Sequence, residues 1–198
     1  MQSSRAENHP AEKRRNCMRT ADRFNKGPVQ DLLNAVVVQA ALDYREFAAK
    51  LIVKPNNRWA AKDLKEVKSF FLSEDFCFYT SVSGDYILKK LAEELAAFDD
   101  VYQVYRQTEA ELMRAARRAA KLLLQKQKCK ADAERIEKEL PDAEKKVHGL
   151  IRNLREQKMK MPEFAGKIVR CPQFDTVMDL ATEQLKEDIL NGKESLWS

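Results

Sequence analysis

Apolar residues recur every three or four positions along most of the chain from residue 28 onward, which is the spacing of one face of an α-helix. The pattern predicts a first helix over 28–53, with Pro28 in its first turn, and second and third helices over 59–72 and 85–97. Their apolar seams are Leu32, Leu33, Val36, Val37, Ala40, Tyr44, Phe47 and Leu51; then Trp59, Leu64, Val67, Phe70 and Phe71; then Tyr86, Ile87, Leu88, Leu91 and Leu95.

The segment between the second and third helices contains Phe76, Phe78 and Tyr79 and is predicted to form a short irregular or 3₁₀ turn. A β-strand over 76–82 is the alternative, and the turn is favoured because no partner strand is evident elsewhere. Residues 28–98 then form a three-helix domain. Its dense aromatic residues indicate a helical core, with a base-stacking platform as the alternative.

Residues 99–140 form a long helical run, up to ~60 Å at 1.5 Å per residue. A second apolar seam with the spacing of a coiled coil starts near its end. It contains Leu122, Cys129, Ala133, Ile136 and Leu140, and it continues beyond Pro141. Proline disfavours a regular helix at the preceding residue, so two outcomes stay open. Either 122–140 pairs with 143–160 as a helical hairpin, or the helix kinks and runs on. Similar seam lengths favour the hairpin, and the absence of glycine at the turn counts against a tight one.

The remaining residues, 161–198, are predicted to form a loop, a last helix over 176–190 with Asp175 as its N-cap, and a tail after Asn191 and Gly192. The predicted fold class is therefore all-α. A three-helix N-terminal domain is followed by a long helix or coiled-coil-like hairpin over 99–160 and by a C-terminal helix. Leu196 and Trp197 are either a docking peptide or part of the core.

Charge is distributed unevenly along the chain, whose net charge is +5. Residues 1–27 hold seven basic and three acidic side chains and lack periodicity, which predicts a disordered basic tail. Residues 101–160 hold 16 basic and nine acidic side chains, whereas 28–100 and 161–198 are each slightly acidic. A basic arm and a basic tail thus extend from a slightly acidic body.

Residues 113–131 hold seven basic side chains and no acidic one. In a helix, five of the seven fall within roughly 100° of arc, opposite an apolar seam of Tyr105, Leu112, Ala116, Ala119 and Leu123. These five, here called the basic ridge, are Arg114, Arg117, Arg118, Lys121 and Lys128. A solvated helix face normally alternates glutamate with lysine, so the acid-free span predicts contact with phosphates or an acidic protein surface. A solvated face is the alternative. The basic tail is expected to add secondary contacts to the same partner through five residues, Lys13, Arg14, Arg15, Arg19 and Arg23.

No catalytic or metal-binding chemistry is predicted, and no cofactor. The cysteines Cys17, Cys77, Cys129 and Cys171 are widely spaced, which excludes a typical zinc motif. Four free thiols would fit a reducing compartment. No apolar run approaches the ~20 residues that span a bilayer, and no apolar signal core is present. The predicted location is therefore cytoplasmic, without a membrane partner.

Four stretches resemble small uncharacterised helical proteins of phages and mobile elements of Gram-positive bacteria. They are D-L-L-N-A-V-V-V-Q-A-A-L-D-Y-R from Asp31, N-N-R-W from Asn56, F-F-L-S-E-D-F from Phe70 and G-D-Y-I-L-K-K-L from Gly84. The resemblance covers residues 30–97 and implies a phage or mobile-element origin and a bacterial host cell. The resemblance identifies no catalytic residue in this sequence.

The leading hypothesis is a non-enzymatic protein that binds nucleic acid, or a nucleic-acid-handling complex, through the basic ridge. By analogy with small basic phage proteins, the alternative is a stoichiometric inhibitor that binds a host defence nucleoprotein complex, as anti-CRISPR proteins do. A third hypothesis is a structural coiled-coil protein that forms a homodimer through residues 122–154.

Overall fold

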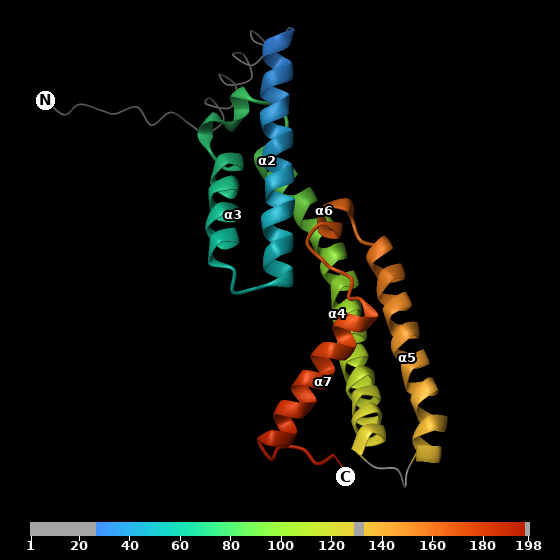
Figure 1. Ribbon diagram of the computed structural model, residues 1–198. Helices are drawn as coiled ribbons and strands as arrows, with labels where there is room; N and C mark the ends of the chain where they lie inside the picture. The colour runs from blue at the N-terminus through green and yellow to red at the C-terminus, as the bar shows by residue number, and fades with distance from the viewer. Residues whose placement is uncertain (1–26, 129–132, 197–198) are drawn as a thin grey trace, which may run out of the picture. The chain divides into compact units, whose positions relative to one another are not determined.

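The computed structural model describes residues 27–128 and 133–196, and every regular element in these ranges is helical (Figure 1). The elements in chain order are α2 (Pro28–Val53), α3 (Arg58–Phe71), the 3₁₀ helix η1 (Glu74–Phe78), α4 (Gly84–Lys128), α5 (Ala133–Met159), α6 (Glu163–Gly166) and α7 (Phe174–Leu190). The predicted all-α fold is confirmed. The secondary basic residues Lys13, Arg14, Arg15, Arg19 and Arg23 lie outside the described residues.

The chain divides into two compact units, residues 1–97 and 98–198. In the first unit, α2 and α3 lie side by side (Figure 1). Pro28 occupies the start of α2, and the side chain of Asn57 caps α3 by accepting a hydrogen bond from the Ala60 amide at 3.2 Å. Both helices match their predicted ranges within a residue, because proline in a first turn and asparagine at an N-cap are strong start signals.

Part of the aromatic cluster of this unit, Phe70, Phe71, Phe76 and Tyr79, is a packed core, whereas Phe78 is exposed. The Phe70 ring lies 5.5, 5.3 and 5.2 Å from the rings of Phe71, Phe76 and Tyr79, each in edge-to-face geometry. Phe71 and Phe76 are buried. The predicted turn is confirmed, since η1 spans this segment and no strand occurs in the described residues.

Some positions of the predicted apolar seams are exposed. Trp59 is 77% exposed, Leu32 is 66% exposed and Tyr86 is 56% exposed, so their predicted burial is wrong. For Leu32 the reason is geometric: α3 has 14 residues and α2 has 26, so α3 cannot cover the whole length of α2. The lengths of these helices do not explain the exposure of Trp59 on α3 or of Tyr86 on α4.

Of the described cysteines, Cys171 is a free thiol and Cys77 is disulfide-bonded, so the expectation of free thiols is wrong at Cys77. A disulfide is uncommon in a reducing compartment, and the cytoplasmic location stays a prediction. None of the described helices has both the length and the apolar composition needed to cross a bilayer. Within the described ranges, no three His, Cys, Asp or Glu side chains are grouped so that they could hold a metal ion.

Helix α4 is continuous over 45 residues, which corrects the predicted break between a third helix and a long helix. Ser83 starts it, because its hydroxyl oxygen accepts a hydrogen bond from the Tyr86 amide at 3.1 Å. At the predicted break, Phe98 is fully buried, and Asp99 accepts a hydrogen bond from Gln103 one turn later at 2.9 Å. No glycine or proline interrupts this stretch, so the helix has no reason to end there.

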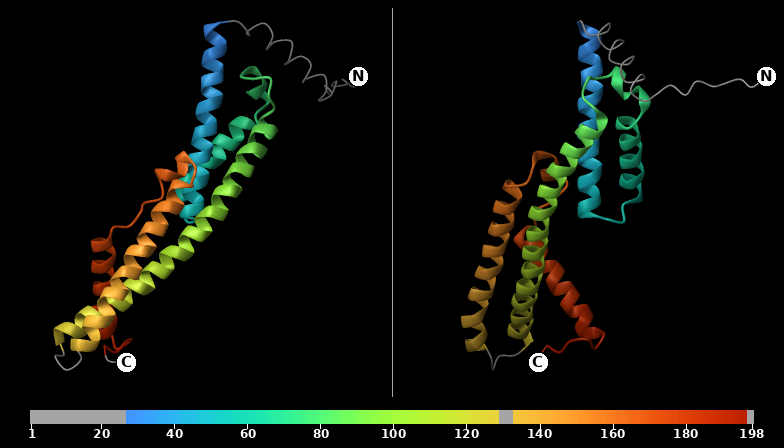
Figure 2. Two further views of the ribbon diagram at one scale, coloured as in Figure 1. Left: turned by 90° about the vertical axis from the view of Figure 1, so that its right-hand side faces the viewer. Right: turned by 180° about the vertical axis from the view of Figure 1, so that it is seen from behind.

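In the second unit, α5 runs antiparallel to the C-terminal half of α4 (Figures 1 and 2). The predicted pairing of 122–140 with 143–160 is wrong, because α5 begins at Ala133 and continues through Pro141, as the alternative of a helix that runs on predicts. The hairpin that forms instead consists of α4 and α5. Pro141 is exposed, so water can solvate the carbonyl that loses its helical donor. The buried seam contains Leu122, Ile136 and Leu140, with Leu123 and Ala143 packed against it. The predicted dimer seam is therefore buried within a single chain.

The rest of the second unit packs against α4. The rings of Phe98 on α4 and Phe164 on α6 meet edge to face, 5.8 Å apart. Helix α7 begins at Phe174 with Gln173 at its N-cap. Asp175 lies in the first turn, so its predicted role as the N-cap is wrong. At the other end Asn191 is the C-cap, as predicted.

Replacing Tyr105 with phenylalanine should lower the stability of this unit by about 1 kcal/mol, because the Tyr105 hydroxyl donates a 2.9 Å hydrogen bond to the Arg170 carbonyl. Burial raises the pKa of Tyr105, so the phenol favours folding only while it is protonated. This contribution is complete below the unfolded-state pKa near 10 and is lost as the pH rises further. Urea unfolding from pH 8 to 11 should therefore show a weaker alkaline loss in the variant, while the exposed Tyr86→Phe control should follow the wild type.

Candidate nucleic-acid interface

The basic ridge lies on α4, opposite the apolar seam that anchors this helix. Tyr105, Leu112, Ala116 and Ala119 are buried as predicted, and Leu123 is half-buried. The packing of this seam fixes the rotation of α4. The structure then divides the ridge into residues that carboxylates cover and residues that solvent reaches.

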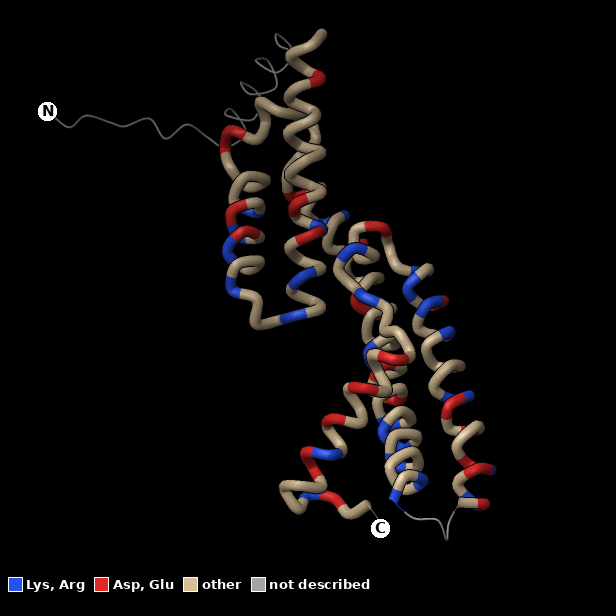
Figure 3. Tube along the Cα trace, in the orientation of Figure 1, with Lys and Arg blue, Asp and Glu red and all other residues tan. Residues whose placement is uncertain are grey.

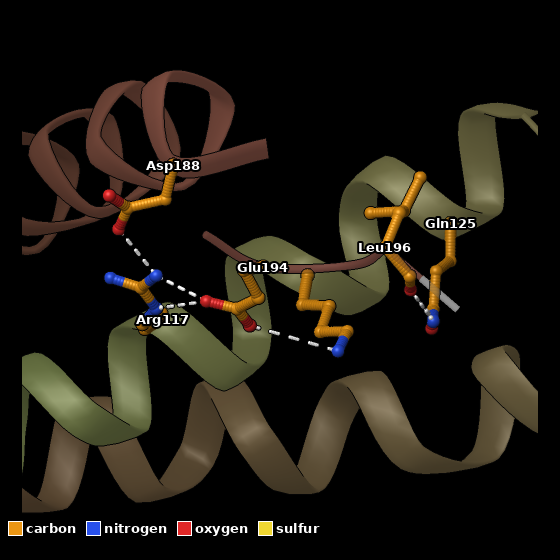
Figure 4. Close-up of polar contacts among 6 residues, drawn as sticks. Arg117, Gln125, Asp188, Glu194 and Leu196 are labelled. Atoms are coloured by element: carbon orange, nitrogen blue, oxygen red, sulfur yellow. Dashed lines mark hydrogen bonds and ion pairs between the residues drawn. The ribbon is translucent and has the colours of Figure 1, made fainter. Parts of the chain in front are cut away.

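Arg117 belongs to the covered part (Figure 4). Its guanidinium donates hydrogen bonds to Asp188 Oδ2 at 2.6 Å and, through Nε, to Glu194 Oε2 at 2.9 Å. The bonds to Glu194 and then to Asp188 raise the pKa of Arg117, so its charge is retained. All three side chains are between a quarter and two fifths exposed, so solvent screening limits the energy of this contact to about 1 kcal/mol.

Residues 193–196, here called the C-terminal segment, extend the covered part along α4 (Figure 4). Lys121 Nζ lies 3.7 Å from the second Glu194 oxygen, Oε1. One turn further, Gln125 Nε2 donates a 2.6 Å hydrogen bond to the Leu196 carbonyl, and both residues are buried. Leu196 therefore packs against the core. Trp197 lies outside the described residues.

Gly192 directs the C-terminal segment back toward α4. It has a φ of +68°, in the left-handed region that glycine adopts at low cost. The amides of Lys193 and Glu194 both donate hydrogen bonds to the Asp188 carbonyl, at 2.9 and 3.3 Å. This closing turn of α7 brings Glu194 to the ridge.

Arg114 and Arg118 belong to the open part of the ridge. Both are exposed, and they line an open hollow together with Glu111, Ala115 and Lys146 of α5. Two long ion pairs border this hollow. Arg118 Nη2 is 3.7 Å from Glu139, and Lys146 Nζ is 3.3 Å from Glu111. Such exposed pairs are worth about 0–1 kcal/mol each, so they leave the cations available to a competing anion.

Lys128, the fifth ridge residue, is exposed at the last position of α4. Its neighbour Lys126 lies 3.6 Å from Glu137 of α5. Figure 3 shows Lys and Arg gathered along the end of α4, mainly Asp and Glu along α7, and residues of both signs along α5. The acid-free span thus receives its carboxylates from other elements, which offset its like-charge repulsion.

Sequence reasoning missed four residues of this site: Gln125, Lys146, Asp188 and Glu194. Gln125 lies only about 20° from Arg114 around the helix, so the ridge pattern itself contained it. The acidic excess of residues 161–198 was the available signal for Glu194. Lys146 could be assigned to this site only once the register between α4 and α5 in the hairpin was known.

No family model, curated protein or solved structure matches this chain. The resemblance to phage and mobile-element proteins therefore stays a prediction.

Proposed function

We propose that this protein is a non-enzymatic protein that binds nucleic acid, free or within a complex, through the hairpin of α4 and α5. The observation that supports the proposal best is the convergence of Arg114, Arg118 and Lys146 from two helices on one open hollow. All three side chains are exposed, so phosphate oxygens can reach them without displacing any other element.

Such a surface suits the phosphate backbone and not the bases. Arginine and lysine bind phosphates through charge-assisted hydrogen bonds, which carry no sequence information. Each neutralised phosphate releases counterions, so the affinity falls with salt at a slope of about 0.9 per phosphate. Three contacts predict a slope of about 2.7 in a plot of log affinity against log salt concentration.

The test is a triple variant, Arg114→Gln, Arg118→Gln and Lys146→Gln, measured by fluorescence anisotropy with a labelled DNA duplex and a single-stranded RNA. Loss of three phosphate contacts should weaken binding by about tenfold or more at low salt and flatten the salt dependence. The matched control is Arg58→Gln, Lys65→Gln and Lys89→Gln in the first unit, which removes the same charge from exposed positions.

Equal affinities of the two triple variants would contradict a hairpin interface. Absence of nucleic-acid binding, with a stoichiometric protein complex recovered from the host, would support the inhibitor hypothesis. A dimer mass in solution without either partner would support the coiled-coil assembly hypothesis.

A further inference from the structure

The strip of the ridge between Arg117 and Gln125 is covered by the protein's own acidic residues. At 100° per residue, Gln125 lies within the same arc as the ridge cations, yet it is only 8% exposed because Leu196 lies over it. Lys121, between them, is only 20% exposed at its side chain. The C-terminal segment therefore occupies the part of the ridge that would otherwise extend the open cations along α4.

The contacts that hold this cover imitate those of a bound phosphate. Asp188 and Glu194 present carboxylate oxygens to the Arg117 guanidinium, and Glu194 also reaches toward Lys121. A phosphodiester of nucleic acid offers the same kind of acceptor, two anionic oxygens that share one negative charge. Glu194 and Asp188 already accept hydrogen bonds from Nε and Nη2 of Arg117, so a phosphate that binds through these two atoms and the docked Glu194 exclude each other.

The cover is attached in a way that allows displacement. Every ion pair in it is partly exposed, so each is weak and weakens further with salt. The C-terminal segment follows the Gly192 turn. The hydrogen bonds that close this turn run from the amides of Lys193 and Glu194 to the backbone carbonyl of Asp188, so they do not involve the Asp188 side chain. Rotation after this turn would release Glu194 from Arg117 and Lys121 without unfolding α7. Asp188 would stay on α7 beside Arg117, and the buried Leu196 would become exposed.

From these contacts we infer that the C-terminal segment is an autoinhibitory cover that competes with nucleic acid for Arg117 and Lys121. This inference rests on the proposed function, and it gives the ridge a closed and an open state. In the closed state Arg114, Arg118 and Lys146 bind phosphates. In the open state Arg117 and Lys121 add to them, which raises both the affinity and the salt slope.

The test is the double variant Asp188→Asn and Glu194→Gln, whose side chains keep their shape but lose the charges that compete with phosphate. We expect it to bind a labelled DNA duplex about 5- to 30-fold more tightly than the control, with a salt slope steeper by up to about 1.8 for two added phosphates. The control is Glu183→Gln and Glu187→Gln, two exposed residues of the same helix. The control variant has the same net charge as the Asp188/Glu194 variant. Any gain in affinity that comes from net charge alone is therefore equal in the two variants.

A second measurement follows the cover itself. Trypsin cleavage after Lys193, which is exposed, should be faster in the Asp188/Glu194 variant than in the control, and added duplex should accelerate it in the wild-type protein. Circular dichroism checks that the helices are intact.

The outcomes separate this inference from the proposed function. If wild type binds the duplex and both double variants bind equally, the cover is overturned and the interface stands. If the wild type fails to bind and the Asp188/Glu194 variant binds, the cover is supported, and binding through Arg114, Arg118 and Lys146 alone is contradicted. If no protein binds, including the Asp188/Glu194 variant, the interface fails and the cover with it.

Discussion

Replacing Gly84 with alanine is expected to destabilise the first unit by about 3 kcal/mol, the upper part of the usual range for overpacking. A Cβ atom at this position would lie 1.8 Å from the Phe71 carbonyl oxygen and 2.7 Å from its carbonyl carbon. Both are backbone atoms at the end of α3, so no side-chain rotation can relieve the clash. Either α4 must start elsewhere or α3 must move, and each change disturbs the aromatic core beside Phe71.

The measurement is urea unfolding followed by far-ultraviolet circular dichroism. The matched control is Gly149→Ala on α5, where an added Cβ has nothing within 4 Å. That substitution should stabilise the helix by about 0.5–1 kcal/mol, because glycine is unfavourable in a helix interior. If Gly84→Ala changed stability by less than about 0.5 kcal/mol, the size of an ordinary surface substitution, the close approach of α4 to α3 would be wrong.

The helices could be predicted where local chemistry marks their ends. Pro28, Asn57 and Asn191 are such marks, and each lies where the structure begins or ends a helix. The chain path at Pro141 could not be predicted in the same way, because a local helix-breaking signal competes there with packing on both sides. Ile136 before the proline and Val147 after it are both fully buried, so α5 stays helical across it.

The direction of the ridge could be predicted from the sequence, but its electrostatic partners could not. Helical spacing alone places Arg114, Arg117 and Arg118 on one face. The carboxylates that pair with Arg117 lie 71 and 77 residues later in the chain, on α7 and the C-terminal segment. Their approach depends on the packing of α7 and on the Gly192 turn, and neither leaves a periodic signal near the ridge.

Replacing Ile136 with aspartate is expected to unfold the hairpin, with a loss of at least about 4 kcal/mol. Ile136 is fully buried in the seam with Leu122 and Leu140. The change removes the burial of a branched side chain and places a carboxylate where the seam offers apolar neighbours. Because such a site would raise the pKa of the introduced carboxyl, the loss should be greatest at neutral pH and smaller at pH 4, where the group is protonated.

The same substitution tests whether the interface depends on the pairing of α4 with α5. Arg114 and Arg118 reach Lys146 only while the hairpin is closed, so nucleic-acid affinity should fall with the helical signal. Lys138→Asp, at an exposed position on the same helix, changes the charge more strongly but leaves the seam intact. It should lower affinity through charge alone and keep the helical content.

A hairpin that stayed folded with aspartate in place of Ile136 would show that this residue does not lie in the seam. Full affinity in an unfolded hairpin would show that the ridge binds as an isolated basic helix, because convergence on one hollow would then contribute nothing.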